Sequence, residues 1–269
     1  CAIRQGLVQG VPRNGLATVR IWQANVNEKI VSHVPMCEGE VQELGEFELD
    51  GVTFPAAEIK LDFIEPGAGG NGVLPTGAVL DRLVVPGLGD FDVTLLNSGN
   101  PTVFIDAAAL GLRGSELQGD VNHNSELLER FEAVRSHAAV AMGLAESATY
   151  AREHRQHTPK IAFVGPPAPY TASSGKAVGH EDTDVLVRIL SMGKLHHAMT
   201  GTGAVAIATA AAIPGTILSR ALGGPRSSIR FGHPSGVLRV GADAREGPGG
   251  WEVMKVAMSR SARRLMEGW

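Results

Sequence analysis

The chain has 269 residues and a mass of 28.2 kDa, enough for two domains or one large one, and its 43% hydrophobic content suffices for ordinary cores. A net charge of −4 and a pI near 6.2, without clusters of Lys and Arg interleaved with aromatic residues, argue against nucleic-acid binding. The two cysteines, Cys1 and Cys37, supply neither a disulfide framework nor the spacing of a metal site, which suits a reducing cytoplasm.

The first residues, 1–5 followed by Gly6, have the pattern of the last turns of a helix with a glycine stop. We therefore expect the chain to begin inside a helix and to be a fragment of a longer protein. Two sharper hypotheses for Cys1 are a processed N-terminal nucleophile and a lipidated cysteine. Arg4 and Gln5 interrupt any apolar segment, so the sequence predicts no signal peptide.

Apolar residues alternate with polar ones in the first part of the chain, which predicts β-strands. The expected strands, the first two joined by the turn Asn25-Val26-Asn27, are 19–21, 30–34, 46–49 and 57–63. The glycine-rich run 66–72 is typical of a connection between domains. We place a domain boundary near Gly70.

Beyond this boundary the sequence predicts both helices and strands. An amphipathic helix over 127–142 follows the cap Asn124, and a second helix over 185–190 follows Asp182 or Thr183. An uncharged, alanine-rich helix over 204–212 ends before Pro214 and should be buried on every side. The strands expected here are 83–85, 91–96, 102–105, 160–164, 229–231, 237–240 and 252–258.

The stretch 191–206, S-M-G-K-L-H-H-A-M-T-G-T-G-A-V-A, places small, polar and basic residues directly before the alanine-rich helix. The first N–H groups of a helix lack intrahelical partners and carry the positive end of the helix dipole, and glycines let an anion approach the backbone. Thr200 and Thr202 add hydroxyl donors. We therefore predict an anion-binding site at the start of this helix.

The distribution of charge favours the same site. Residues 185–242 contain no Asp or Glu but six cations, Arg188, Lys194, Arg220, Arg226, Arg230 and Arg239. In a chain of negative net charge, a long segment of one sign indicates a field that attracts an anionic ligand.

Three other interpretations of this stretch stay open. G-T-G-A-V-A fits a dinucleotide-binding fingerprint, but a poor strand precedes it and Arg226 stands where an acidic residue is expected. The uncharged run 198–219 has the length of a membrane span, but it contains Pro214, glycines and hydroxyl residues. The plainest interpretation is a core helix with a glycine-rich entry turn and no ligand.

Six motifs spread over nearly the whole chain resemble the PrpF family of 2-methylaconitate cis-trans isomerases. They are V-R-I-W-Q-A-N (19–25), G-E-F-E-L-D-G-V-T-F-P (45–55), N-S-G-N-P-T (97–102), H-T-P-K-I-A-F-V (157–164), the stretch 191–206, and F-G-H-P-S-G (231–236). Together they are specific, whereas the G-T-G motif alone is not.

The resemblance implies an α+β, diaminopimelate epimerase-like fold of two pseudo-symmetric domains, each a curved sheet around a central helix, with the active site where the two helix N-termini converge. On this basis we expect residues 1–70 to be the remainder of the N-terminal domain. Residues 71–257 would form the C-terminal domain, and 258–269 a terminal strand that returns to the first. The family's catalytic cysteine and lysine would lie upstream, so neither Cys1 nor Cys37 is given their role.

The same resemblance and the anion-site argument select the residues expected to bind substrate. In amino-acid epimerases of this fold the matching segment carries an acid–arginine pair and a catalytic cysteine. Here Ser191 and Met192 replace the pair and Thr200 replaces the cysteine, which argues against an amino-acid substrate. The adjacent His196 and His197 are tempting acid–base candidates, but neighbours in a regular segment cannot both face one ligand. The expected substrate contacts are Asn100, Ser191, Met192, Gly193, Lys194, His196, Thr200, Gly201, Thr202 and Gly203.

The reaction implied by the resemblance shifts or inverts a C=C bond of an unsaturated tricarboxylate, by removing an allylic proton and returning one. We expect a cytoplasmic isomerase of 2-methylaconitate that needs no metal, flavin or nucleotide cofactor and is linked in function to a methylcitrate dehydratase. The alternatives are a 4-oxalomesaconate-type tautomerase and, for a chain without the first catalytic domain, an inert carboxylate-binding half-enzyme. The sequence leaves the oligomeric state open.

Overall fold

The computed structural model describes residues 2–24, 27–67 and 72–266. The predicted turn residues Asn25 and Val26 and the predicted boundary at Gly70 lie outside this part. The strands are β1 (Gly15–Gln23), β2 (Glu28–Cys37), β3 (Glu40–Val41), β4 (Ile59–Ile64), β5 (Asp81–Val85), β6 (Gly89–Ser98), β7 (Asn100–Asp106), β8 (Lys160–Gly165), β9 (Tyr170–Thr171), β10 (Ala177–Val178), β11 (Val185–Ser191), β12 (Lys194–Leu195), β13 (Ser228–His233), β14 (Gly236–Gly247) and β15 (Gly250–Arg260). The α-helices are α1 (Gln118–Asn122), α2 (Ser125–Ala141), α3 (Ala148–His154), α4 (Gly201–Ala212) and α5 (Ile217–Ala221), and the 3-10 turns are η1 (Ala107–Leu110) and η2 (His180–Asp182).

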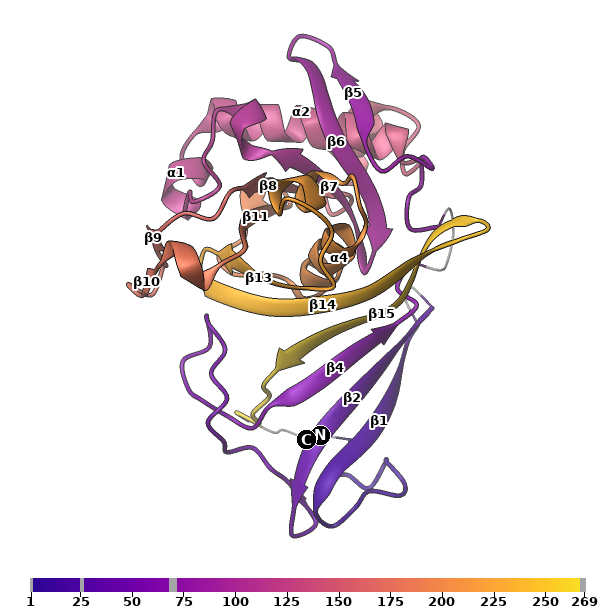
Figure 1. The fold of residues 1–269 in the computed structure, drawn as a ribbon, viewed down its shortest axis with the longest axis vertical. Helices are drawn as coiled ribbons and strands as arrows, with labels where there is room; N and C mark the ends of the chain where they lie inside the picture. Colours follow the sequence, from indigo (N-terminus) through magenta and orange to yellow (C-terminus); the bar gives the residue numbers. More distant parts are fainter. Residues whose placement is uncertain (1, 25–26, 68–71, 267–269) are drawn as a thin grey trace.

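One mixed sheet runs through the described chain in the order β1-β2-β4-β15-β14-β13-β11-β8-β7-β6-β5. Most neighbours pair antiparallel, but β7 pairs with β8 and β11 with β13 in parallel. Figure 1 shows the strands from β14 to β5 curling around α4, while β15, β4, β2 and β1 fan out below them. The arrangement confirms the prediction of an α+β fold with a curved sheet around a central helix.

Helix α4 is the centre of the larger core. Alanine favours the helix, Thr200 caps it by accepting a hydrogen bond from Gly203 N–H, and Pro214 prevents its continuation. Every residue from Gly203 to Ala211 is buried against strands of the surrounding sheet. Its small side chains allow the close approach, and Ser98 of β6 meets Thr209 of the helix through their hydroxyl oxygens at 2.9 Å. The predicted burial on every side is confirmed.

A second core lies on the opposite side of β5–β8. Leu127, Phe131 and Val134 of α2 pack on this face, and the rings of Phe131 and Phe163 lie 5.3 Å apart between centroids. The sheet is therefore covered by α4 on its inner face and by α2 on its outer face (Figure 1). Apolar residues on both faces explain the nearly continuous hydrophobic runs of β6, β7 and β8.

Strand β15 belongs to two parts of the sheet. Its residues pair with β14 on one side, from Gly250 to Met258, and with β4 on the other, from Lys255 to Arg260. Residues more than two hundred positions apart in the sequence, such as Ile59 and Arg260, are therefore direct strand partners. Figure 1 shows β14 and β15 crossing the middle of the molecule between α4 and the strands β4, β2 and β1.

Two sequence predictions are wrong. Residues 185–190 form strand β11 rather than a helix, because all six side chains are buried between β8 and β13, which satisfies a continuous apolar run better than a one-sided helix. Residues 46–49 form no regular strand and contribute only the isolated bridge between Phe47 and Ala56. None of the described helices combines the length and the apolar character that a membrane span requires.

The burial of α4 predicts that a charge within it unfolds the larger core. Ala208 is 1% exposed, so Ala208→Asp places a carboxylate without a partner among apolar side chains, at a cost of several kcal/mol. Thermal unfolding followed by circular dichroism should show a large loss of stability. Ala109→Asp, at an exposed position of η1, is the matched control. An Ala208→Asp variant that melts within about 2 °C of the parent would contradict the central role of α4.

Candidate functional site

The start of α4 leaves backbone donors free. Gly203 N–H donates to Thr200 Oγ1 at 3.1 Å and Ala204 N–H donates to the Thr200 carbonyl at 2.9 Å. Within the described chain the N–H groups of Gly201 and Thr202 have no such partner. Both belong to residues that are partly exposed, so two amides and the positive end of a buried helix face accessible space. The arrangement can bind a carboxylate.

The turn between β6 and β7 packs on this helix start. Gly99 has φ +68°, and a Cβ atom there would lie 2.7 Å from Val205 Cβ and 2.9 Å from the Thr202 carbonyl oxygen. Only glycine fits this contact. Asn100 follows directly, and its buried Oδ1 has no hydrogen-bond partner in the described chain. The Asn100 side chain therefore presents a free acceptor next to the helix start, which a donor group of a ligand could satisfy.

A tight hairpin joins β11 to β12. Ser191 pairs with Lys194, and the two residues between them, Met192 and Gly193, have φ +53° and +72°, as two-residue hairpins require. Met192 is exposed, and Lys194 directs Nζ to the Asn122 carbonyl at 3.3 Å. Three predicted site residues thus form a hairpin tip, and Lys194 contacts α1 rather than the helix start.

Lysine 160, at the start of β8, joins this hairpin to the histidines. Lys160 Nζ donates to Ser191 Oγ at 2.8 Å, and partial burial lowers the pKa of Lys160. The pKa of His196 is also lowered, first by burial and then by the neighbouring positive charges of His197 and Lys160, against the hydrogen bond with the Ala198 carbonyl. The charge of Lys160 therefore acts on His196.

The two adjacent histidines stack on each other. Their ring centroids lie 4.8 Å apart at an interplanar angle of 16°. His196 N–H extends the sheet by donating to the Ile189 carbonyl at 2.9 Å, and the His197 carbonyl accepts the Ser235 hydroxyl at 2.5 Å. Both rings lie side by side just before α4, in contrast to the expectation that neighbours point apart. The segment is irregular between β12 and α4, which removes the assumption behind that expectation.

The turn 233–236 contacts the segment before α4 through the Ser235 hydroxyl, which donates to the His197 carbonyl. Tyr170 Oη donates to the carbonyls of His233 and Gly236 at 2.8 and 2.6 Å, and Ser235 N–H donates to His233 Nδ1 at 3.3 Å. His233 is 2% exposed, and burial lowers its pKa to about 4, helped by the charges of Arg188, Arg260 and His196 and opposed by Asp50. His233 is therefore neutral near pH 7, with its proton on Nε2 because Nδ1 accepts.

A hollow of about 620 Å³ opens beside this turn. It is lined by residues 48–53 and Pro55, by Ser173 and Ser174, and by His197 and Ser235. Asp50, one of the lining residues, accepts hydrogen bonds from Val237 N–H and from Lys176 Nζ, both at 2.7 Å, and so links residues 48–53 to β14 and to the loop before β10. The described residues include no group of three or more His, Cys, Asp or Glu side chains that could hold a metal ion.

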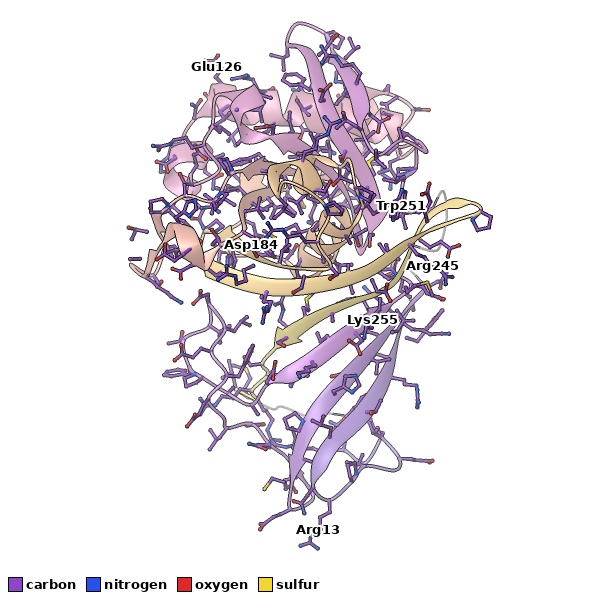
Figure 2. The ribbon with its side chains drawn as sticks, viewed as in Figure 1. Arg13, Glu126, Asp184, Arg245, Trp251 and Lys255 are labelled. Carbon is purple, nitrogen blue, oxygen red and sulfur yellow. The ribbon has the colours of Figure 1, made fainter. Side chains whose placement is uncertain are left out.

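Ion pairs and burial reduce the positive charge that the sequence predicts for residues 185–242. Arg226 and Arg230 form ion pairs with Asp184, at 3.5 and 3.4 Å, and Asp184 lies one residue before the acid-free segment (Asp184 is labelled in Figure 2). Arg188 is fully buried with its guanidinium 4.9 Å from the centre of the Tyr170 ring. Half of the six predicted cations are therefore neutralised or enclosed. The positive character of the site comes instead from the start of α4 and from Lys160.

Sequence reasoning gathered some site residues and missed others. Residues 200–203 lie at the start of α4, and Asn100 follows Gly99, which packs on Thr202 and Val205; the anion site itself stays a prediction. Lys160, His233 and Ser235 were not selected, although they lie in the motifs H-T-P-K-I-A-F-V and F-G-H-P-S-G. Lys160 and His233 each stand at one end of a buried strand, and polar residues at strand ends often contribute to sites formed by loops. This position in the sequence could have identified them as candidates.

The sequence matches a family described as "PrpF protein" over residues 1–269. It is 56% identical to the 2-methyl-aconitate isomerase of Shewanella oneidensis and 54% identical to that of Cupriavidus necator, covering 100% of this chain and 69% of each relative. The crystal structure of a methylitaconate-delta-isomerase superposes with a TM-score of 0.86 at 33% identity, covering 99% of this chain and 68% of that one. These similarities agree with the diaminopimelate epimerase-like, α+β architecture described above.

Burial of neutral His233 predicts that acid destabilises the protein. Between pH 6.5 and 4 His233 binds a proton in the unfolded state but not in the folded state. The free energy of unfolding therefore falls as the pH falls, by about 3 kcal/mol for this histidine. The free energy of unfolding, measured with urea, should fall by about 3 kcal/mol less over this pH range for His233→Gln than for the parent. His157→Gln changes an exposed histidine and should show the same pH dependence as the parent. Equal pH slopes for the parent and His233→Gln would contradict the assignment.

Proposed function

This chain belongs to the PrpF family, and from that premise we propose that it isomerises 2-methylaconitate, moving or inverting the C=C bond by removing an allylic proton and returning one. The identities of 56% and 54% to two proteins named for this reaction support that substrate over the oxalomesaconate alternative. The proposal assigns no metal, flavin or nucleotide cofactor. It also places the protein in the cytoplasm.

The observation that carries the proposal is the free helix start beside Asn100. An allylic C–H next to a carboxylate is a weak acid, and its removal leaves a dienolate whose negative charge spreads onto oxygen. Fixed backbone donors stabilise such a charge without reorganising, and they are most effective where water is excluded. The N–H groups of Gly201 and Thr202 are donors of this kind.

The flanking basic side chains suit a substrate with several carboxylates. Burial lowers the pKa of both Lys160 and His196, and the charge of Lys160 lowers that of His196 further, so a bound carboxylate would stabilise the charged form of either group. We therefore propose that the substrate lies between the helix start and these two side chains. The proposed contacts are Asn100, Ser191, Met192, Gly193, Lys194, His196, Thr200, Gly201, Thr202 and Gly203, with Lys160 added from the geometry.

We also propose a domain organisation for the chain and an enzyme that acts before or after it. We assign residues 1–70 to the remainder of an N-terminal domain, 71–257 to a C-terminal domain and 258–269 to a returning strand, an assignment supported by the pairing of β15 with β4. Because the substrate is an unsaturated tricarboxylate, a dehydratase acting on methylcitrate is the class of enzyme that would supply it or consume its isomer.

The reaction is tested by incubating the protein with 2-methylaconitate in D₂O and following the substrate by proton NMR. We expect isomerisation with deuterium at the carbon that exchanges its proton, unaffected by a chelator. Conversion of 4-oxalomesaconate alone would favour the tautomerase alternative. Binding of the tricarboxylate without turnover would favour the inert carboxylate-binding half-enzyme, and activity lost to a chelator and restored by metal would contradict the cofactor-free proposal.

The sequence-based role of Lys194 is tested separately. If its ammonium leaves Asn122 and binds a substrate carboxylate, Lys194→Met should raise the dissociation constant of the tricarboxylate by roughly tenfold or more, since a charge-assisted hydrogen bond is worth about 1.5–3 kcal/mol. Isothermal titration calorimetry provides the measurement. Lys60→Met, which removes an exposed lysine from β4, is the control. Equal affinities for all three proteins would remove Lys194 from the site.

A further inference from the structure

Arg260, the last residue of β15, lies on the inner face of the sheet. Successive side chains of a strand point to opposite faces, so Arg260 shares a face with Met258 and Val256. Both of these are buried in the core around α4, at 4% and 0% exposure. The guanidinium of Arg260 is therefore on the side of the sheet that carries the central helix, not on the outer face.

Arg260 is also at the end of the sheet nearest the start of α4. Strand β13 begins near the end of that helix, where Arg226 N–H donates to the Ala211 carbonyl, and it ends at His233, next to the Ser235–His197 contact that precedes α4. Strand β14 returns from Gly236, opposite His233, and its Val240 pairs with Met258 of β15. Arg260 lies one inward-facing position beyond Met258, toward the Gly236 end.

The charge of Arg260 has no counter-ion in the described part of the chain. Its one hydrogen bond there runs from Nη1 to the carbonyl of the neighbouring Ser259, at 3.2 Å, and it forms no ion pair. Burial lowers its pKa. Asp50, whose charge acts on the same region, is engaged by Lys176 and Val237 N–H. Holding a half-buried guanidinium without an anion is costly, unless a ligand supplies one.

Arg260 acts on the same histidine as the groups described above. Its positive charge lowers the pKa of His233, together with Arg188 and His196, so each of these three side chains lies within electrostatic range of His233. Arg188 and Arg260 are cations, His196 can become one, and Asp50 is the anion among the groups that act on His233. A carboxylate next to His233 would be attracted by the charges of Arg260 and Arg188.

We propose that Arg260, with the imidazole of His233 beside it, binds one carboxylate of the substrate, opposite the carboxylate held at the start of α4. The inference rests on the proposed function, because it names a second carboxylate subsite of that same site. The planar guanidinium presents parallel N–H donors that match a carboxylate in a bidentate pair. Two subsites on different elements select a ligand with two or more carboxylates at a fixed separation.

The test compares binding of cis-aconitate, a tricarboxylate, by isothermal titration calorimetry to the full chain and to Arg260→Met. We expect Arg260→Met to weaken binding at least tenfold, the loss of one charge-assisted pair. Arg239→Met is the matched control, because Arg239 is an exposed arginine on the outer face of the neighbouring strand β14 and its removal changes the net charge equally. We expect that control to bind within twofold of the parent.

Two further measurements keep the outcome clear. Arg260→Lys keeps the charge and should recover part of the affinity, and a crystal of the unchanged protein with cis-aconitate should show a carboxylate within hydrogen-bond distance of the Arg260 guanidinium, whether or not the variants fold. Equal affinity of the parent and a folded Arg260→Met, or a crystal with the ligand away from Arg260, overturns the inference alone. A parent that binds no tricarboxylate overturns the proposed function as well.

Discussion

The close packing of a small-residue helix inside a curved sheet is the constraint on which the other features depend. Gly203 to Ala211 are all buried against the surrounding strands, and the turn between β6 and β7 can pack on the helix only because position 99 is glycine. That contact places Asn100 at the start of the helix. The same packing fixes the partly exposed start of α4, with the positive end of its dipole, beside this turn, so the contacts that stabilise the core also form the anion site.

Much of the fold could be predicted from sequence because it is encoded in local pattern. The alanine-rich helix that ends before Pro214 was predicted from composition, whereas its start at Gly201 and its Thr200 cap were not. Most strands follow from alternation or from short apolar runs. Strand β11 was mistaken for a helix, because six buried residues in a row satisfy either structure until the neighbouring strands are known. Pairing between β4 and β15 is a tertiary fact that no local pattern contains.

Some residues of the candidate site could likewise be predicted from local sequence, and others could not. Donors that are consecutive in sequence, Thr200 to Gly203, were found from their spacing before a helix. Lys160 and Arg260 reach the site from other elements and were not found from the sequence. Burial in the folded chain lowers the pKa of both side chains, and no local pattern predicts that burial. The net positive charge of a sequence window was a weak guide, since Asp184 neutralises two of its arginines across a strand end.

The shared strand β15 has a consequence for how the protein is made. Strand β4 emerges from the ribosome long before β15, which is the last described strand of the chain, so one edge of β4 has no backbone partner until synthesis has passed Arg260. An unpaired edge is a template for pairing with another chain. Lys60 and Asp62 alternate with apolar residues along β4, and charges on an exposed edge oppose such association. The nascent chain thus carries its own protection against aggregation at the position where completion of the sheet is longest delayed.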